Sequence, residues 1–501
     1  MIVNTALVLA TLTSFGSVLA TPQAAYQPFP PSVGPPQAPL GNCDTPQRVV
    51  GGYIASWAAY EPKWYLSDVP YQDLTHLWYS FIYLRTDGGI EVGDPDIDLY
   101  GLTDEEKEKI VSNLDTRPPP EDNPPQAPLN STLQPGIPFD PPVGKNQTEN
   151  IGLKWLRDHK NVTGDTKVMV ALGGWTWSHN FAAVAANETK RGVFAESVKG
   201  FLNEWKLDGI DIDWEYPTDP RVNGTLEDKE NFVLLMKELR ASIGPEKVIS
   251  LAVSASTIIS PEKNNQSLIQ AGIDVKLADY VDMFNVMGYD FAGYWSEVVT
   301  HDAPLYGNIS VSAAIAQFKE IGIPASKLNL GIPAYGYMFY NTDGTGMGGN
   351  MSTEGNRIQG TWDTAENNMS WTGNFDYSHI QQAFANNSDW TYQFDNATAG
   401  SWLWNKEKNL VLTYDSAEAV QVKSDYAEAE GLGGMFVWEL SNDRAGDLVS
   451  VMAGVVEQPE APETSSIPSE KTSTVSNWGP VQTGSSSPHY RRSRARRAGR
   501  V

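Results

Sequence analysis

The segment that most constrains how this chain folds is an acidic stretch at residues 207–217, which reads Leu-Asp-Gly-Ile-Asp-Ile-Asp-Trp-Glu-Tyr-Pro. Apolar and acidic residues alternate along it with the two-residue period of a β-strand. The apolar positions are Ile210, Ile212 and Trp214, and the acidic positions are Asp211, Asp213 and Glu215. Because the other strand-like segments are apolar runs, we expect both faces of this strand to be buried. The sequence therefore predicts three carboxylates that line a protein interior.

Buried carboxylates destabilise a fold unless they are hydrogen-bonded, paired or protonated, and they are usually retained where they perform chemistry. A calcium-binding loop does not fit this segment. Such a loop needs a glycine at its sixth position, and Tyr216 stands there when the count starts at Asp211. The segment thus favours an acid–base catalytic site and predicts no metal.

Eight short strand-like segments, seven apolar and one acidic, recur along the chain, with helical patterns between them. The segments cover residues 48–57, 76–84, 167–174, 207–217, 248–254, 280–290, 328–336 and 433–438. The clearest helical pattern lies at 226–243, where Leu226, Phe232 and Leu235 belong to a set of apolar residues at helical spacing. Buried strands that alternate with helices predict an α/β fold with a parallel sheet. Periodicity leaves open whether this sheet is a closed (β/α)₈ TIM barrel or an open doubly wound sheet.

The remaining segments differ from this pattern in composition. Residues 1–20 are predicted to be a secretory signal peptide, because an apolar stretch ends there in a small-x-small motif. Residues 21–46 are predicted to be a Pro-rich linker, and residues 113–148 a Pro-rich loop insertion. Residues 337–413 combine several tryptophans with strand-like runs, which predicts a small α+β insertion domain. Residues 456–501 are predicted to be a disordered Ser/Thr/Pro-rich tail that ends in an Arg-rich run.

Composition and charge narrow the class of partner. The formal net charge of −25 argues against nucleic acid or an anionic membrane as a partner, and no run besides the signal segment is apolar enough to span a bilayer. Cys43 is the only cysteine, so no intramolecular disulfide can form. Eleven glycosylation sequons support an extracellular location. Their asparagines are Asn130, Asn146, Asn161, Asn187, Asn223, Asn265, Asn308, Asn350, Asn368, Asn386 and Asn396.

Residues 208–215, Asp-Gly-Ile-Asp-Ile-Asp-Trp-Glu, resemble the D-G-x-D-x-D-x-E signature of glycoside hydrolase family 18, the chitinases. The resemblance covers about residues 47–455 and extends to secreted, fungal-type members with an insertion domain between strands seven and eight. It implies a TIM barrel whose fourth strand carries the acids, with Glu215 at the end of the barrel that holds active sites. It also implies a monomer that hydrolyses β-1,4 linkages of chitin or chito-oligosaccharides without a cofactor, by endo rather than exo action.

The spacing of the acids says less about mechanism than the resemblance does. Asp213 and Glu215 are two residues apart on one strand face, so their Cα atoms lie only about 6–7 Å apart. They therefore suit mutual tuning better than attack from opposite sides of a sugar. The resemblance implies that Glu215 is acid and then base, while the 2-acetamido oxygen of the substrate attacks the anomeric carbon. It implies that Asp213 holds the acetamide N–H and that Asp211 shares a proton with Asp213.

Further matches to the family lie at the ends of other strands. The resemblance implies that Tyr289 donates to the acetamide carbonyl and that Tyr53 hydrogen-bonds the buried Asp211. The residues that it assigns to substrate binding are Tyr53, Phe81, Trp175, Met287, Asp290 and Trp438. It also predicts cis peptide bonds at Ser80–Phe81 and Trp438–Glu439.

Two positions depart from the family pattern. Ala171 stands where many members have serine, which removes a hydrogen bond to Asp211 and leaves Tyr53 as its expected main side-chain donor. Tyr337 stands where many members have arginine, which removes a cationic sugar contact. Two alternative functions are a chitin-binding lectin without catalysis and an endo-β-N-acetylglucosaminidase that acts on N-glycans. The presence of Glu215 argues against the lectin, and the predicted insertion domain favours a linear polymer as substrate.

Overall fold

The computed structural model describes residues 48–60, 62–110, 150–255, 259–260, 266–351, 358–361, 363 and 372–454. The predicted signal peptide, the linker, the Pro-rich loop insertion, Cys43 and the C-terminal tail lie outside these ranges. The described residues after Arg48 belong to one compact unit.

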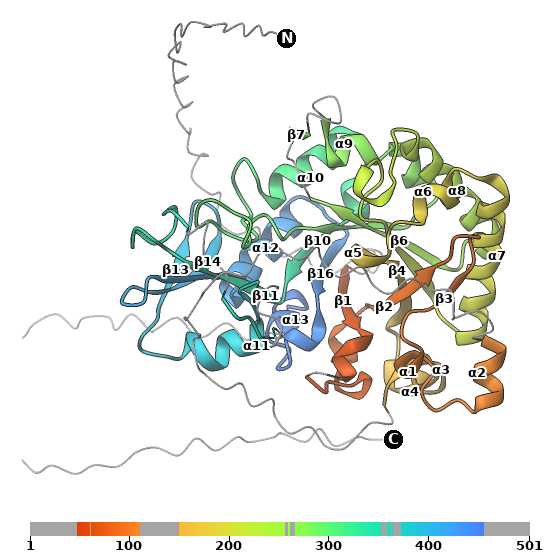
Figure 1. Cartoon of the computed structure of the whole chain (residues 1–501), viewed down its shortest axis with the longest axis horizontal. Coiled ribbons are helices and arrows are strands. Elements are labelled where there is room, and N and C mark those ends of the chain that lie inside the picture. Colours follow the sequence, from red (N-terminus) through yellow and green to blue (C-terminus); the bar gives the residue numbers. More distant parts are fainter. Residues whose placement is uncertain are drawn as a thin grey trace, which may run out of the picture. The chain divides into compact units, whose positions relative to one another are not determined.

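Eight parallel strands close into a barrel in the described part of this unit (Figure 1). They are β1 (Val49–Ala55), β2 (His76–Leu84), β4 (Lys167–Gly173), β5 (Gly209–Asp213), β6 (Val248–Ser254), β9 (Met283–Met287), β10 (Leu328–Pro333) and β16 (Gly434–Trp438). Neighbours in this order are hydrogen-bonded, and β16 pairs back with β1. The short strand β3 (Ile90–Val92) adds antiparallel to β2. The closed (β/α)₈ alternative is therefore correct, and the open sheet is wrong.

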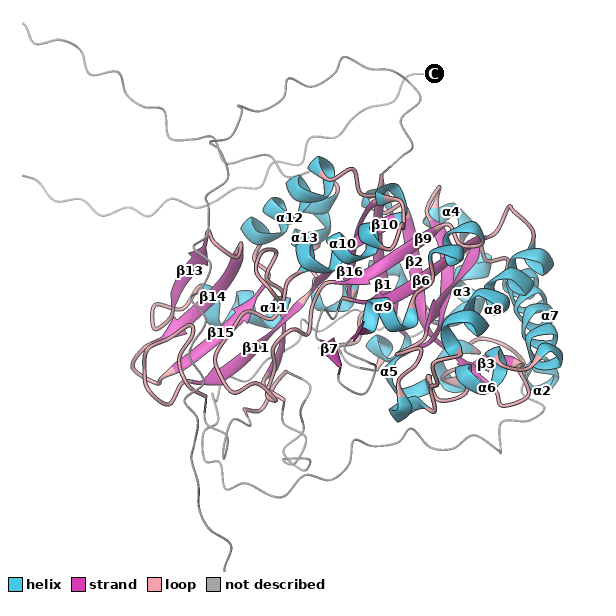
Figure 2. Ribbon diagram, turned by 90° about the horizontal axis from the view of Figure 1, so that it is seen from above, coloured by secondary structure: helices cyan, strands magenta, loops and turns pink. Residues whose placement is uncertain are grey.

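Helices surround the barrel strands (Figure 2). The α-helices are α1 (Pro95–Asp98), α2 (Asp104–Ile110), α3 (Gly152–Asp158), α4 (Lys160–Thr163), α5 (Gly174–Trp177), α6 (Phe181–Ala185), α7 (Glu188–Trp205), α8 (Asp228–Ile243), α9 (Leu268–Gly272), α10 (Val311–Glu320), α11 (Tyr377–His379), α12 (Ala417–Ala429) and α13 (Asp447–Met452). Side-chain caps begin several of them, because an Asn or Ser oxygen accepts a free N–H of the first turn. Asn187 caps α7, Ser310 caps α10 and Ser416 caps α12. None of the described helices is long and apolar enough to cross a membrane.

Apolar side chains fill two layers of the barrel. Ile210 and Ile212 of β5 pack in the layer between strands and helices, together with Phe232 of α8. Tyr53 and Phe436 belong to a second cluster inside the barrel. The two faces of each strand therefore meet different interiors, as the alternating acidic segment requires.

Several boundaries differ from the sequence prediction. The sixth strand is five residues long, Met283–Met287, because the chain on both sides of it turns away from the sheet. The predicted helix at 226–243 begins at Asp228, and Leu226 lies before it with its side chain 58% exposed. Leu226 is therefore not part of the apolar face of this helix.

A five-stranded antiparallel sheet lies beside the barrel in both ribbon views (Figures 1 and 2). Its strands, in spatial order, are β12 (Asn374–Asp376), β11 (Tyr335–Tyr340), β15 (Leu410–Tyr414), β14 (Gly400–Asn405) and β13 (Thr391–Asp395). In the chain it stands between β10 and β16, where the insertion was expected at 337–413. The prediction for the seventh barrel strand was too long, because Tyr335 and Gly336 already pair with β12 and β15. A separate two-stranded sheet joins β7 (Ile259–Ser260) and β8 (Gln266–Ser267).

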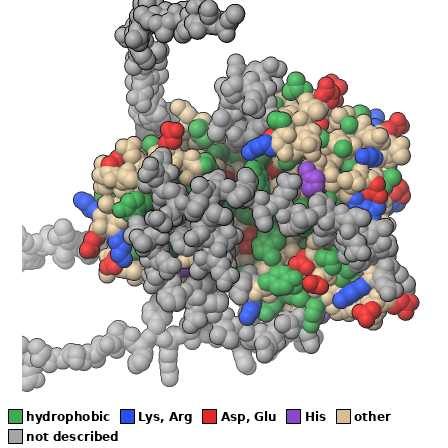
Figure 3. All heavy atoms as spheres, in the orientation of Figure 1, with side chains coloured by type: hydrophobic (Ala, Val, Ile, Leu, Met, Phe, Trp, Pro, Cys, Tyr) green, Lys and Arg blue, Asp and Glu red, His purple; other side chains and the backbone are tan. Residues whose placement is uncertain are grey.

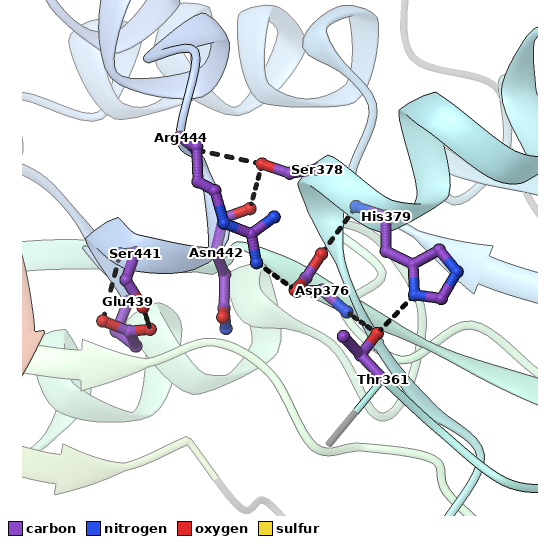
Figure 4. A network of polar contacts seen from close by, with 8 residues as sticks. All are labelled: Thr361, Asp376, Ser378, His379, Glu439, Ser441, Asn442 and Arg444. Atoms are coloured by element: carbon purple, nitrogen blue, oxygen red, sulfur yellow. Dashed lines mark hydrogen bonds and ion pairs between the residues drawn. The ribbon is translucent and has the colours of Figure 1, made fainter. Parts of the chain in front are cut away.

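A polar network joins this second sheet to the segment after β16, and we call it the barrel–sheet joint (Figure 4). The guanidinium of Arg444 forms an ion pair with Asp376 at 2.6 Å, and Asp376 is fully buried. The backbone N–H of Arg444 donates to Ser378, whose hydroxyl donates to the carbonyl of Asn442. The buried ion pair between Lys423 of α12 and Asp415, the residue after β15, adds a second link. Asp376 and Asp415 are thus each paired with a cation.

Candidate active site

A cleft of about 1120 Å³ opens at the C-terminal ends of the barrel strands. Among the residues that line it are nine of the ten predicted from the sequence, namely Tyr53, Phe81, Trp175, Asp213, Glu215, Met287, Tyr289, Asp290 and Trp438. The tenth, Asp211, is completely buried in the barrel interior. The fold therefore brings all ten predicted residues to one region.

The register of the sheet explains why the acids face the barrel interior. Asp211 of β5 stands opposite Ala171 of β4 on one side and Ser250 of β6 on the other. Asp213 stands opposite Gly173, which leaves room at the rim of the barrel. Since residues two apart on a strand share a face, Asp211 and Asp213 both point inward, and Glu215 follows at the open end.

Asp211 accepts a hydrogen bond on each carboxylate oxygen. The Tyr53 hydroxyl donates to Oδ2 at 3.0 Å, and the Ser250 hydroxyl donates to Oδ1 at 2.5 Å. The expectation that Tyr53 is the main side-chain donor is therefore wrong, because a serine on β6 donates from the side opposite Ala171. Burial raises the pKa of Asp211 to about 7, although both hydrogen bonds lower it.

Burial also raises the pKa values of Asp213 and Glu215. Burial raises the pKa of Asp213 well above its ordinary value, and the charges of Glu215 and Asp211 raise it further. Oδ1 of Asp213 has no hydrogen-bond partner among the described residues. Burial raises the pKa of Glu215 to about 7, against a hydrogen bond from Tyr216 that lowers it. Ser178 accepts the backbone N–H of Glu215 at 2.8 Å and thereby holds the chain at this point.

Asp290 lines the same cleft and is held by two phenols. The hydroxyls of Tyr335 and Tyr337 donate to its Oδ1 at 2.8 and 3.0 Å. Its backbone has φ of +59°, a left-handed conformation that is uncommon for a residue with a side chain. Asp302 accepts the backbone N–H of Asp290 at 3.0 Å and supports this conformation. In the sequence, Tyr337 stood out only because it replaces the arginine of many family members. In the structure it orients an acidic residue of the cleft.

Aromatic rings form the walls of the cleft. Phe81 stacks on Trp438 with ring centroids 5.6 Å apart, and Trp57 lies 6.1 Å from Phe81. Trp175 is 56% exposed, and the guanidinium of Arg221 lies over its ring at 5.4 Å. Figure 3 shows hydrophobic side chains gathered over the segment that follows β1, the segment that carries Trp57. Exposed rings of this kind present flat apolar surfaces that can stack on sugar rings.

The backbone of the site contains three non-proline cis peptide bonds, at Ser80–Phe81, Glu215–Tyr216 and Trp438–Glu439. The first and the third are the bonds that the resemblance predicts. The bond at Glu215–Tyr216 was not anticipated.

Sequence reasoning missed several residues of this site. Ser250 lies in a strand whose alternate positions are small, Ser250, Ala252 and Ser254, and this pattern could have identified an inward face. Asn285 and Asn329 interrupt apolar strands, which is a signal for a buried polar role. The Asn285 amide donates to the Tyr53 hydroxyl at 2.9 Å, and the Asn329 amide donates to Asn285 at 2.9 Å. No sequence signal distinguished Trp57 or Arg221.

This arrangement suits acid–base chemistry on a neutral polymer. Glu215 is at the cleft surface with a pKa near neutrality, so it can donate a proton and later accept one. The other two acids lie behind it on the same strand. The aromatic walls can hold the apolar faces of sugar rings.

Comparisons with known proteins agree with this geometry. The family model described as "Glycosyl hydrolases family 18" matches residues 49–443. Chitinase A1 of Niallia circulans is 30% identical over 78% of this chain, and the matched region spans only 56% of that protein. Endochitinase 1 of Metarhizium anisopliae is 27% identical, with 89% of this chain and 94% of that protein covered. A solved Group IV chitinase of Ostrinia furnacalis in complex with allosamidin is 25% identical, covers 81% of this chain and 98% of its own, and superposes with a TM-score of 0.64. The chain therefore belongs to glycosyl hydrolase family 18.

Proposed function

We propose that this protein is an endo-acting chitinase that hydrolyses β-1,4 linkages between N-acetylglucosamine units by a retaining, substrate-assisted mechanism. The observation that carries the proposal is the placement of Glu215 at the cleft surface, with a pKa raised to about 7 by burial and with Asp213 behind it. Another carboxylate of the cleft, Asp290, accepts hydrogen bonds from two tyrosine hydroxyls on Oδ1, which orient it for contact with a sugar. The names of the similar chitinases and the allosamidin complex support this substrate class.

In the first step Glu215 donates its proton to the glycosidic oxygen, and the leaving sugar departs. The 2-acetamido oxygen of the substrate attacks the anomeric carbon in place of a protein carboxylate and forms an oxazolinium-like intermediate. Asp213 accepts the hydrogen bond of the acetamide N–H. The Tyr289 hydroxyl donates to the acetamide oxygen and orients it.

In the second step the ionised Glu215 removes a proton from water, and this water attacks the anomeric carbon from the side that the leaving group vacated. The product keeps the β configuration. Asp211 and Asp213 share one proton. Trp438 and Phe81 form the stacked floor under the reacting sugar, Trp175 stacks on a neighbouring sugar, Asp290 hydrogen-bonds the sugar, and Met287 lines the pocket. No cofactor or metal takes part.

Hydrolysis of defined chito-oligomers, with product anomers resolved early by NMR, tests this proposal. We expect the β-anomer to appear first, and we expect no cleavage of fully deacetylated chitosan, which lacks the acetamide nucleophile. Initial release of the α-anomer, or efficient cleavage of that chitosan, would contradict the mechanism. Binding without cleavage would favour the lectin alternative. Release of N-glycans without chito-oligomer cleavage would favour the endoglycosidase.

The same proposal extends to the rest of the chain. We infer a secreted monomer in which residues 1–20 are the signal peptide, 21–46 a linker, 47–455 the catalytic region and 456–501 a tail. The second sheet is proposed to be the α+β insertion domain that deepens the cleft, and Tyr337 of β11 lines the cleft in support. All seven described sequon asparagines are exposed, which is compatible with N-glycans. Mass spectrometry of the secreted protein, before and after glycosidase treatment, tests both the cleavage site and the glycans.

A further inference from the structure

Two chains of hydrogen bonds end on the buried carboxylate of Asp211. One chain runs from Trp78 of β2 through Ser250 of β6 to Oδ1, with the indole N–H 3.0 Å from the serine oxygen. The other chain runs from Asn285 through Tyr53 to Oδ2. All of these side chains are at most 2% exposed. The carboxylate therefore meets protein donors on both sides.

The chemistry of the Trp78 indole fixes the direction of the hydrogen bonds in the first chain. An indole N–H can only donate, so Ser250 must accept from Trp78, and its own hydroxyl hydrogen is available for Asp211. A proton on Oδ1 of Asp211 leaves that hydroxyl hydrogen without an acceptor among the described residues. The Trp78–Ser250 pair thus favours Asp211 as an ionised acceptor, and Asp213 is left to hold the shared proton.

The sheet register makes positions 171 and 250 equivalent in their access to Asp211. Both stand directly opposite it, on the two strands that flank β5, and both side chains are completely buried. Adjacent strands are only about 4.8 Å apart, so a hydroxyl on either neighbour can reach the carboxylate. Position 171 is Ala, and the hydroxyl is present at 250.

We propose that Ser250, oriented by the indole of Trp78, is a positioning residue that stabilises the ionised form of Asp211 and so compensates for the missing hydroxyl at Ala171. The inference rests on the proposed glycosidase function. The titratable groups that face Asp211 are Tyr53 on β1, Asp213 on its own strand and Tyr289 after β9. The flanking positions on β4 and β6 do not titrate, so the effect of a hydroxyl there can be separated from a change of charge.

The test compares wild type, Ser250→Ala, Ala171→Ser/Ser250→Ala and Trp78→Phe in the full chain, with turnover on a chito-oligomer measured against pH. Loss of the Ser250 donor should lower kcat about tenfold or more and move the acidic limb of the pH–rate profile upward by about one unit or more, with little change in KM. The double variant should move the limb back toward wild type, because a hydroxyl again reaches Asp211. Trp78→Phe should move it upward by less than Ser250→Ala.

A matched control is Ser401→Ala, which removes another completely buried serine that donates to a backbone carbonyl of the second sheet. It should lower the melting temperature without moving the limb. The proposal fails if Ser250→Ala keeps the wild-type limb, or if the folded double variant is as impaired as Ser250→Ala. If Ser250→Ala does not fold, the double variant and Trp78→Phe decide. The proposal is supported if the acidic limb of the double variant is near that of wild type and the limb of Trp78→Phe is shifted upward. Any other pair of results overturns it. A wild-type enzyme inactive on every chito-oligomer instead contradicts the proposed function.

Discussion

The acidic cluster of the cleft and the barrel–sheet joint both bury carboxylates, but they satisfy them differently. Asp211, Asp213 and Glu215 form no ion pair with any residue in the described ranges, and their hydrogen-bond partners are neutral. At the joint, Asp376 is paired with Arg444, and Asp415 with Lys423. A buried carboxylate without a cation has its pKa raised toward neutrality and can exchange protons, as Glu215 does at about 7. Burial raises the pKa of Asp376 and Asp415 as well, but Arg444 and Lys423 oppose that shift, and these paired carboxylates serve the structure instead.

Isosteric neutralisation of a carboxylate in each region should separate the two roles most strongly. Glu215→Gln removes the proton donor and should lower turnover by about 10²–10⁴ or more, with fold and oligomer binding intact. The same chemical change at the joint, Asp376→Asn, should lower the melting temperature and spare most turnover. Kinetics on chito-oligomers, together with thermal denaturation, check both variants. Near-normal turnover of Glu215→Gln would rule out its assigned role.

Within the acidic cluster, Asp213→Asn should cost a factor comparable to that of Glu215→Gln, because the acetamide N–H loses the carboxyl group that accepts it. The loss should appear mainly in kcat, since the sugar is still held by the aromatic walls. Steady-state kinetics with separate kcat and KM values measure this. A loss confined to KM would mean that Asp213 only binds substrate.

At the joint, the cation should matter for stability. Arg444→Met leaves Asp376 buried without its partner and should lower the free energy of unfolding by about 3–5 kcal/mol. Denaturant unfolding followed by tryptophan fluorescence measures the change. The double change Arg444→Met/Asp376→Leu should recover part of the loss, since it removes the uncompensated charge. Equal stability of Arg444→Met and wild type would show that the ion pair is not structural.

The pH dependence of stability should reflect carboxylates without a cationic partner. Burial raises to about 7 the pKa of each of five acids, Asp98, Asp211, Glu215, Glu439 and Asp443. The folded state therefore holds protons that the unfolded chain releases above about pH 4, and the stability this confers is lost as the pH rises through 7. Burial lowers the pKa of His76, His301 and His379 to about 4, whereas a histidine of the unfolded chain titrates near 6.5. Between these values the unfolded chain binds more protons at these histidines, so their contribution makes stability rise with pH.

Above pH 6.5 the unfolded histidines lose their remaining protons, but the five acids release more, so the melting temperature should fall between pH 6.5 and 8. Glu439→Gln should flatten this slope, because one of the five acids is gone. Calorimetry across that range measures both slopes. A melting temperature that stays constant or rises over this interval contradicts the raised pKa values.

The smallest expected effect concerns the donors around Asp211. Ala171→Ser adds a third hydroxyl and should move the acidic limb of the pH–rate profile to lower pH by up to about one unit, with optimal turnover little changed. Tyr53→Phe should move it to higher pH, although Ser250 remains and limits the shift. Profiles of kcat against pH measure both. If neither change moves the limb, Asp211 is not the group that titrates there.

The sequence by itself determined the local features of this protein. The two-residue alternation in 207–217 places the acids on one strand face, and eight strand-like segments separated by helical patterns predict a parallel sheet. The resemblance of the motif and of other strand ends to the family identified the ten residues that the fold brings together. These features depend on residues close in the chain, so the sequence carries them directly.

Only the tertiary structure decided which partners those residues meet. The sequence could not show that Ser250 rather than a residue of β4 reaches Asp211, that Asn285 directs Tyr53, or that Tyr337 holds Asp290. Each contact joins residues from different strands, and which inward positions face one another depends on the register between strands and on closure of the barrel. A strand pattern specifies which face is buried, but the register across the whole barrel specifies what is buried against it.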